Sequence, residues 1–174
     1  MTVQAIASQT LKDAGIDEAA RKAFEDRLVA LARAHDLLTA GEGGGVPLDR
    51  LVSAAIAPFE DGHTFQIDGS ALLLPSRQAV AFALALHELA TNALKYGALS
   101  SPVGQVQIGW QREGAGFRLS WLESGGPPVA APDREGFGTR LLKRNLAAEI
   151  SGEINIDYAP DGVRCEILAP HLSS

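Results

Sequence analysis

The chain has 174 residues, of which 46% are hydrophobic and 21% are charged, and its formal net charge is −6. This length and composition are typical of a globular domain with room for a helical extension, and they exclude a disordered chain. An acidic chain without a basic run also argues against binding to nucleic acid or to a lipid surface. A small anionic ligand held by local Lys, Arg and backbone N–H groups is still compatible with these values.

Cys165 is the only cysteine of the sequence. An internal disulfide is therefore excluded and a cysteine-based metal site is disfavoured, and we expect the cytoplasm, where thiols stay reduced. The first residues lack the basic start and the apolar run of a signal peptide. No stretch of the sequence approaches the roughly 18 apolar residues of a membrane-spanning helix.

Residues 1–40 predict a helical hairpin. A first helix over Thr2 to Leu11 ends before Gly15, and Asp17 is a suitable N-cap for a second helix over Glu18 to Leu38. An apolar seam follows the second helix with nearly a heptad spacing. Its members are Phe24, Leu28, Leu31, His35 and Leu38. One hairpin cannot bury the stripes of both helices, so we expect a second copy or another domain to cover them.

The rest of the chain, residues 46–174, follows a glycine-rich linker at 41–47 and predicts a mixture of helices and strands. We expect helices at 48–58 and 137–150 and, between them, a long helix at 79–100 that starts after Pro75 with Ser76 as its N-cap. Strands are expected at 63–67, 71–74, 104–111, 117–123, 153–158 and 163–168, and the last four should form two hairpins. The pattern predicts an α+β fold, a two-layer α/β sandwich with a mixed sheet and its helices on one face.

The long helix from Ala79 to Ser100 has a narrow polar side. Glu88, Asn92 and Lys95 fall nearly one above another, at spacings i, i+4 and i+7. Three more polar residues flank this line: His87, Thr91 and Tyr96. A solvated helix normally scatters charges over a wide face. A narrow stripe of an acid, an amide and an amine therefore predicts a helix that lines a ligand cavity.

Two glycine-rich points follow this helix. Glu123 ends a predicted strand and precedes Gly125 and Gly126, and Gly136-Phe137-Gly138-Thr139 starts the last helix. Each pattern alone is also that of an ordinary turn. A glycine-rich turn at the start of a helix nevertheless exposes backbone N–H groups and the positive end of the helix dipole, which suits a phosphate.

The order of these features resembles the GHKL superfamily of ATP-binding domains and, within it, the HWE group of sensor histidine kinases. The resemblance rests on HELATNALKYGALS, WLESGGPPV and GFGTRLL. It extends over the hairpin, where TVQAIASQTL and RLVALARAHDLL resemble the dimerisation and phosphotransfer helices of that group. It implies a Bergerat-type ATP-binding domain at 46–174 after a partial dimerisation hairpin at 1–40. ATP and Mg²⁺ are the implied cofactors.

The resemblance implies a role for each residue of the polar stripe. Asn92 would ligate Mg²⁺ through its amide oxygen, a suitable hard ligand. Glu88 is the implied catalytic residue, which would hold a metal-bound water or polarise the attacking group. Lys95 would neutralise phosphate charge. Tyr96 would pack near the adenine or the ribose.

The resemblance also implies the two ends of the nucleotide site. Glu123 would accept a hydrogen bond from the adenine amino group, and Gly125 and Gly126 would give room for the ring. Around the phosphates it implies contacts from a set of four residues: Gly136, Phe137, Gly138 and Thr139. The segment 127–135 would be the ATP lid.

The phosphoacceptor histidine of this group lies in an H-box, of the HRVKN type, a few residues upstream of the TVQAIA stretch. The sequence begins at Met1, so we expect the chain to lack its acceptor and not to autophosphorylate. His35 precedes an Asp, as acceptors of another kinase class do, but its place on the second helix favours a structural role. The resemblance further implies a sensor domain upstream, a response-regulator receiver domain as partner, and a homodimer formed through the hairpin.

Two other functions stay open on the sequence alone. The first is a non-catalytic module that docks a response regulator and carries a vestigial nucleotide pocket. The second is a GHKL serine kinase that acts on a partner protein, a function in which the hairpin would have no obvious role.

Overall fold

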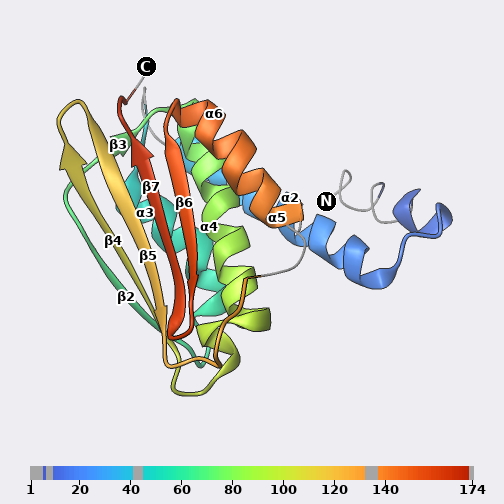
Figure 1. Cartoon of the computed structure of the whole chain (residues 1–174). Helices are drawn as coiled ribbons and strands as arrows, with labels where there is room; N and C mark the ends of the chain where they lie inside the picture. The colour runs from blue at the N-terminus through green and yellow to red at the C-terminus, as the bar shows by residue number, and fades with distance from the viewer. Residues whose placement is uncertain (1–5, 7–9, 41–44, 132–136, 173–174) are drawn as a thin grey trace.

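The structure, a computed structural model, describes residues 6, 10–40, 45–131 and 137–172. A five-stranded sheet forms one layer and helices cover one of its faces (Figure 1). The chain therefore has the predicted α+β fold of two layers.

The sheet has the strand order β2-β4-β5-β7-β6. β2 and β4 are parallel, and every other neighbouring pair is antiparallel. The strands are β2 (Thr64–Gly69), β4 (Gln105–Glu113), β5 (Gly116–Ser124), β6 (Glu153–Ala159) and β7 (Gly162–Ala169). Alternate residues of β4 and β5 are buried beneath the helices, as the period of two along a strand requires. The two hairpins β4–β5 and β6–β7 were both predicted.

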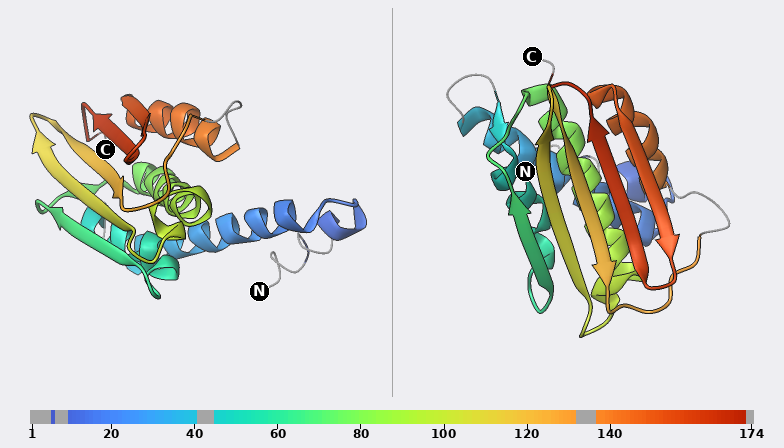
Figure 2. Two further views of the ribbon diagram at one scale, coloured as in Figure 1. Left: turned by 60° about the horizontal axis from the view of Figure 1, so that its bottom comes forward. Right: turned by 60° about the vertical axis from the view of Figure 1, so that its left-hand side comes forward.

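The helical layer has α4 (Ser76–Tyr96) at its centre, with α3 (Leu48–Ile56) on one side. On the other side the last predicted helix consists of three consecutive parts: α5 (Phe137–Arg140), the π-helix η3 (Leu141–Leu146) and α6 (Ala147–Ile150). Two 3₁₀ turns extend α3 and α4, η1 (Ala57–Phe59) and η2 (Ala98–Ser100). Figure 2 shows these helices side by side on the sheet. Phe82 of α4 packs on Phe117 of β5, with ring centroids 5.4 Å apart, so α4 is anchored to the middle of the sheet.

Three local predictions need correction. β1 (Val46–Pro47) lies in the predicted linker and pairs with β3 (Leu73–Leu74) in a separate two-stranded sheet. Ser76 is the first residue of α4 and makes no capping hydrogen bond, because Pro75 occupies the N-cap position. The helix also ends at Tyr96, earlier than predicted, because the chain turns at Gly97 into η2.

α2 (Glu18–Ala40) is the second helix of the predicted hairpin. Its N-cap is the predicted Asp17, whose Oδ1 accepts a hydrogen bond of 3.0 Å from the N–H of Ala20. The C-terminal half of α2 packs on α3 and α4, and the N-terminal half projects from the body as an arm (Figures 1 and 2). The predicted first helix falls mostly outside the described residues.

The face of α2 that packs on the body differs from the predicted seam. Ala30 and Ala34 are its buried residues, because small side chains let two helices approach closely. In the seam, Phe24 and Leu31 are each 39% exposed and His35 is exposed. Among the described residues, no helix has the length and apolar character needed to cross a membrane.

Candidate functional site

Glu88 lies at the middle of α4 and is held by the arm. Its carboxylate accepts two hydrogen bonds from Arg27 of α2: Nε to Oε1 at 2.5 Å and Nη2 to Oε2 at 3.1 Å. The side chain of Glu88 is 6% exposed and that of Arg27 is 25% exposed. Such a two-pronged, charge-assisted contact fixes the position of the carboxylate. Removal of one partner from a buried pair costs about 3–5 kcal/mol, because the other charge stays buried and unpaired.

The start of the last helix lies directly against this carboxylate. A β-carbon on Gly138 would lie 2.1 Å from Oε2 of Glu88, so only a glycine fits at this position. Thr139 is buried beside it in the sequence. The structure therefore brings together Glu88 and Gly138, which are 50 positions apart in the sequence. Gly136 and the side chain of Phe137 lie outside the described residues.

Glu123 forms the other end of the candidate site, where β5 meets the end of α4. Its Oε1 accepts a hydrogen bond of 3.0 Å from the indole N–H of Trp121, and its Oε2 accepts one of 2.9 Å from the N–H of Ala98. Burial raises the pKa of Glu123, against the lowering effect of these two hydrogen bonds. An adenine amino group would have to add a further hydrogen bond to one of these oxygens, which have the lone pairs for it.

The glycines after Glu123 pack against the backbone of the chain. A β-carbon on Gly126 would lie 2.6 Å from Cα of Ala98, and one on Gly125 would lie 2.5 Å from the carbonyl oxygen of Val103. Gly125 also has φ of +72°, which favours glycine. These glycines let the end of β5 approach η2 closely, and their role toward an adenine ring stays a prediction.

Asn92 lies between the two ends of the candidate site, one turn beyond Glu88 on α4, and is half-buried. Lys95 is exposed, and Tyr96 is 73% exposed at the end of the helix. From Glu88 to Gly97 the helix rises by about 14 Å, at 1.5 Å per residue. The polar stripe thus changes along α4 from a buried acid to an exposed amine.

His87, which flanks the polar stripe, packs against a neighbouring aromatic ring. Its ring lies against that of Phe59, with centroids 5.4 Å apart, and the residue is 7% exposed. Burial lowers the pKa of His87, although the charges of Glu88 and Asp26 oppose this effect. Burial at this position thus favours the neutral imidazole over the charged one.

Comparisons with known proteins bear on the family and the fold of the chain. The family model described as HWE histidine kinase matches residues 1–71. A blue-light-activated histidine kinase from Brucella anthropi is 42% identical over 97% of this chain, and its counterpart from Brucella ovis is 41% identical over the same share. The chain belongs to the HWE histidine kinase family. It spans about a third of the length of these curated relatives, 35% and 36% respectively.

Solved structures show the fold of this HWE family member. The histidine kinase domain of a blue-light-activated histidine kinase from Erythrobacter litoralis superposes with a TM-score of 0.74 at 18% identity, over 97% of this chain and 82% of that one. The ATP-binding domain of PrrB from Mycobacterium tuberculosis superposes with a TM-score of 0.58 at 18% identity, over 76% of this chain and 100% of that one. At this identity the likeness extends to the fold alone.

The residues present suit Mg²⁺. The described residues contain no group of three or more His, Cys, Asp or Glu side chains that could hold a metal ion. Mg²⁺ does not need such a cage, because it commonly takes one or two protein ligands and completes its shell with waters and phosphate oxygens. The carboxylate of Glu88 and the amide of Asn92, one turn apart, are oxygen donors of this kind.

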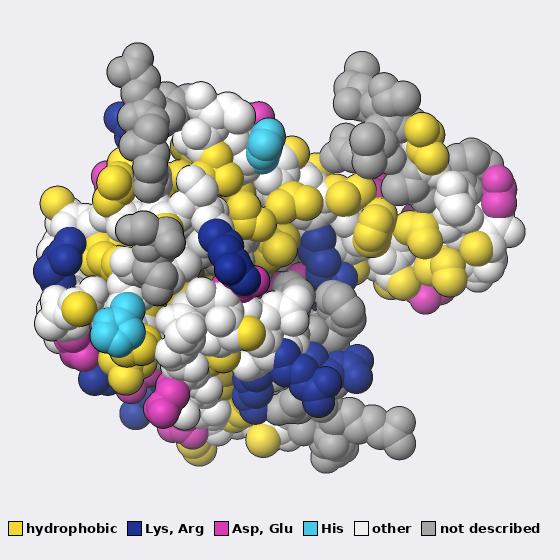
Figure 3. Space-filling view, turned by 90° about the horizontal axis from the view of Figure 1, so that it is seen from above, with side chains coloured by type: hydrophobic (Ala, Val, Ile, Leu, Met, Phe, Trp, Pro, Cys, Tyr) yellow, Lys and Arg dark blue, Asp and Glu magenta, His cyan; other side chains and the backbone are white. Residues whose placement is uncertain are grey.

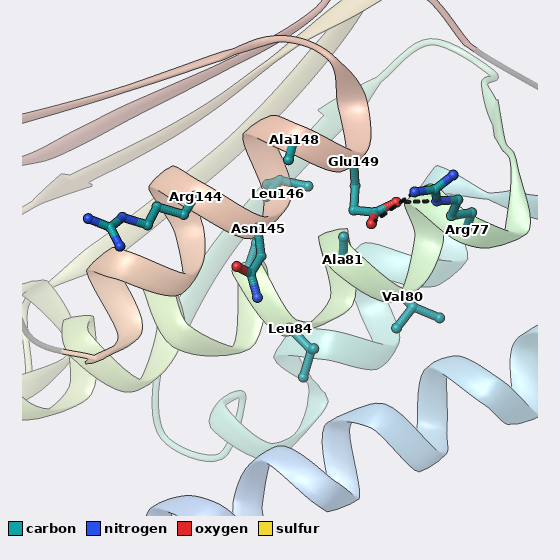
Figure 4. A pocket seen from close by; sticks show the side chains of 10 residues that line it. Arg77, Val80, Ala81, Leu84, Arg144, Asn145, Leu146, Ala148 and Glu149 are labelled. Atoms are coloured by element: carbon teal, nitrogen blue, oxygen red, sulfur yellow. Dashed lines mark hydrogen bonds and ion pairs between the residues drawn. The ribbon is translucent and has the colours of Figure 1, made fainter.

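A groove of about 510 Å³ lies between the first half of α4 and the segment η3–α6. Figure 4 shows the ion pair of Arg77 with Glu149 at one end, and Val80 and Leu84 pointing away from α6 toward α2. The groove is not lined by any of the predicted nucleotide-binding residues. It carries an ordinary surface ion pair over an apolar floor.

Sequence reasoning missed the contacts that hold both acids of the site. Arg27 stands one turn before Ala30 and two turns before Ala34 on α2, and only the choice of the small-residue face as the buried one would have revealed it. Gly97 had a clearer signal, since a glycine after a helix commonly terminates it. Its place against Glu123 depends on tertiary structure, because a β-carbon on Gly97 would lie 2.0 Å from Oε2.

Proposed function

We propose that this chain is the ATP-binding catalytic core of a sensor histidine kinase. The observation that carries the proposal is the junction of Glu88 with Gly138, which joins the polar stripe of α4 to a glycine-rich helix start. Membership of the HWE family supports the same reading. We further propose the division into a helical hairpin at 1–40 and a nucleotide-binding domain at 46–174.

In this proposal the polar stripe of α4 binds the phosphates and their metal. Asn92 ligates Mg²⁺, and Lys95 neutralises phosphate charge from the exposed end of the helix. Bound Mg²⁺ supplies positive charge that stabilises the transferring phosphoryl group. Tyr96 packs at the open side of the base or ribose.

The rest of the site binds the two ends of the nucleotide. Glu123 orients the adenine through its amino group, with Gly125 and Gly126 beside the ring. The phosphate side consists of four residues that start the last helix: Gly136, Phe137, Gly138 and Thr139. Backbone N–H groups at a helix start favour negative charge, and Gly138 brings them close to Glu88.

The reaction in this proposal is transfer of the γ-phosphoryl group of ATP to a histidine. A ring nitrogen of the acceptor imidazole forms a bond to the γ-phosphorus, while the bond from that phosphorus to the bridging oxygen breaks and ADP leaves. The acceptor also loses its ring proton. In this proposal Glu88 is the base that takes this proton or polarises the ring N–H bond.

We propose that none of the four histidines of the sequence is the acceptor. His87 is buried against Phe59, and His35 lies on the exposed side of α2. Incubation with radiolabelled ATP should therefore leave the chain unlabelled. Label that disappears in His35→Ala would contradict this and identify His35 as an acceptor.

The proposed partners are a response-regulator receiver domain and a second copy of the chain, bound through the arm. Figure 3 shows hydrophobic side chains gathered along the arm, where Phe24 and Leu31 are exposed. Their heptad spacing suits helix-to-helix packing. A sensor domain upstream and a cytoplasmic location complete the proposal.

Calorimetry with ADP and Mg²⁺ tests the proposed function and separates it from a docking module with a vestigial pocket. The wild type should bind Mg-ADP, and Asn92→Ala should lose the Mg²⁺-dependent part of the affinity. Asn145→Ala is the matched control, because Asn145 is an exposed amide in the neighbouring groove (Figure 4). Unchanged affinity in Asn92→Ala would reject the site, and a wild type that binds no nucleotide would favour the docking module.

A further inference from the structure

The contact of Arg27 with Glu88 joins the arm to the centre of the candidate site. Both oxygens of the carboxylate accept a hydrogen bond from the guanidinium group, at 2.5 and 3.1 Å. Gly138 closes the carboxylate from another direction, with a virtual β-carbon 2.1 Å from Oε2. Glu88 therefore has little free surface, 6% of its side chain.

Arg27 stands where the arm leaves the body. Ala30 and Ala34, the buried residues of α2, follow it at the helical spacings i+3 and i+7, so the three share one face. The part of α2 before Arg27 projects away from the sheet and its helices (Figure 2). A displacement of the arm would therefore act on the guanidinium group before it reached any other part of this helix face.

The geometry restricts what Glu88 can do while the pair is intact. A carboxylate that contacts a hydrated metal ion or an attacking group needs at least one oxygen turned toward it. In this structure both oxygens are turned toward Arg27. Contact with Mg²⁺ therefore requires Glu88 to give up at least one of these hydrogen bonds.

We propose that Arg27 is a positioning residue that competes with Mg²⁺ for Glu88, so that docking of the arm and binding of Mg-nucleotide oppose each other. This inference rests on the proposed function. The coupling is reciprocal: Mg-nucleotide loosens the arm at Arg27, and an undocked arm raises the affinity for Mg-nucleotide by the same factor. A signal that moves the arm would thus reach the catalytic acid through one ion pair.

The test compares the affinity for ADP with and without Mg²⁺, measured by calorimetry on the full chain. Arg27→Gln should raise the ratio of the affinity with Mg²⁺ to the affinity without it by on the order of tenfold, a usual size for such coupling. Arg27→Lys keeps the charge but lacks the planar guanidinium fork, so it should give an intermediate ratio and guards against misfolding of the first variant. Arg33→Gln, an exposed arginine further along α2, is the matched control and should leave the ratio unchanged.

A double variant separates this role from a purely structural one. In a Glu88→Gln background the competition is absent, so Arg27→Gln should no longer change the ratio. Hydrogen exchange gives a second readout. Mg-ADP should accelerate exchange of the α2 amides around Arg27 in the wild type and in Arg33→Gln, but not in Arg27→Gln.

An unchanged ratio in Arg27→Gln, or an equal change in the Glu88→Gln background, would overturn the inference and leave the proposed function intact. A wild type that binds no ADP under either condition would overturn both. Loss of stability in Arg27→Gln with an unchanged ratio would show that the pair serves folding alone.

Discussion

Gly97 lies so close to Glu123 that a β-carbon on it would sit 2.0 Å from the carboxylate oxygen Oε2. The same oxygen accepts a hydrogen bond from the N–H of Ala98, one residue later. The end of α4 and the end of β5 are therefore fitted together around one buried carboxylate. Any side chain at Gly97 has to displace that group or part the helix from the strand.

Gly97→Ala should lower the free energy of unfolding by about 1–3 kcal/mol, because overpacking moves the carboxylate and breaks its hydrogen bond to Ala98. Urea denaturation followed by circular dichroism measures this change. Gly109→Ala in β4 is the control, since a β-carbon there would lie 3.2 Å from the rotatable hydroxyl of Ser120. Equal losses in the two variants would contradict the argument.

The stability of the chain should depend on pH through Glu123. Burial raises the pKa of this carboxyl above its ordinary value of 4.5. Between the ordinary and the raised pKa, the folded chain holds a proton that the unfolded chain has released. Stability therefore falls as the pH rises through this window and levels off above it.

Glu123→Gln isolates this effect, because the amide does not titrate. The free energy of unfolding of the wild type relative to Glu123→Gln should fall as the pH rises from 4.5 toward neutrality. Denaturant titrations of both proteins over this range provide the measurement. A relative stability that rises with pH would mean that the hydrogen bonds from Trp121 and Ala98 outweigh burial.

Replacement of Phe24 and Leu31 together by Lys should weaken self-association through the arm without lowering the melting temperature. Burial of one such side chain contributes about 1.5–3 kcal/mol, so the dissociation constant of a dimer should rise by at least about tenfold. Sedimentation equilibrium measures it. Ala34→Lys is the contrasting variant: Ala34 is 1% exposed against the body, so that change should destabilise the fold. Unaltered association in the double variant would place the dimer contact elsewhere.

Cys165 should be inert in the folded chain. Burial raises the pKa of its thiol to about 12, so only about one thiol in ten thousand is thiolate at about pH 8. Iodoacetamide should therefore label the protein only after urea unfolds it. Comparable labelling of the native chain would mean that β7, which carries Cys165, opens readily.

The local signals of the sequence predicted the architecture well. The alternating residues of β4 and β5 and the long apolar side of α4 are patterns that each element carries by itself. β3 lies within the strand expected at 71–74, but its partner β1 was missed, because a strand of two residues is too short to show a period. The cap of α2 at Asp17 was found because it is a local hydrogen bond.

The sequence pointed to residues of the candidate site but not to the contacts that hold them. Glu88, Glu123 and Gly138 were singled out, but the partner of Glu88 lies 61 positions away on a helix with two possible packing faces. Large apolar residues predicted the heptad seam as the contact face, whereas Ala30 and Ala34 pack closely on the body. No spacing along the chain distinguishes these faces, because the choice depends on the shape of α3 and α4.

The packing of the C-terminal half of α2 on the body also affects which fragments of this protein are suitable for study. A fragment that starts at Val46 would lose Ala30 and Ala34 and would uncover the apolar surface of α3 and α4 on which they pack. It would also leave the carboxylate of Glu88 without its guanidinium partner. Affinities and stabilities measured on such a shortened protein would describe a Glu88 in altered surroundings, and fragments for biophysical work should begin no later than Asp17.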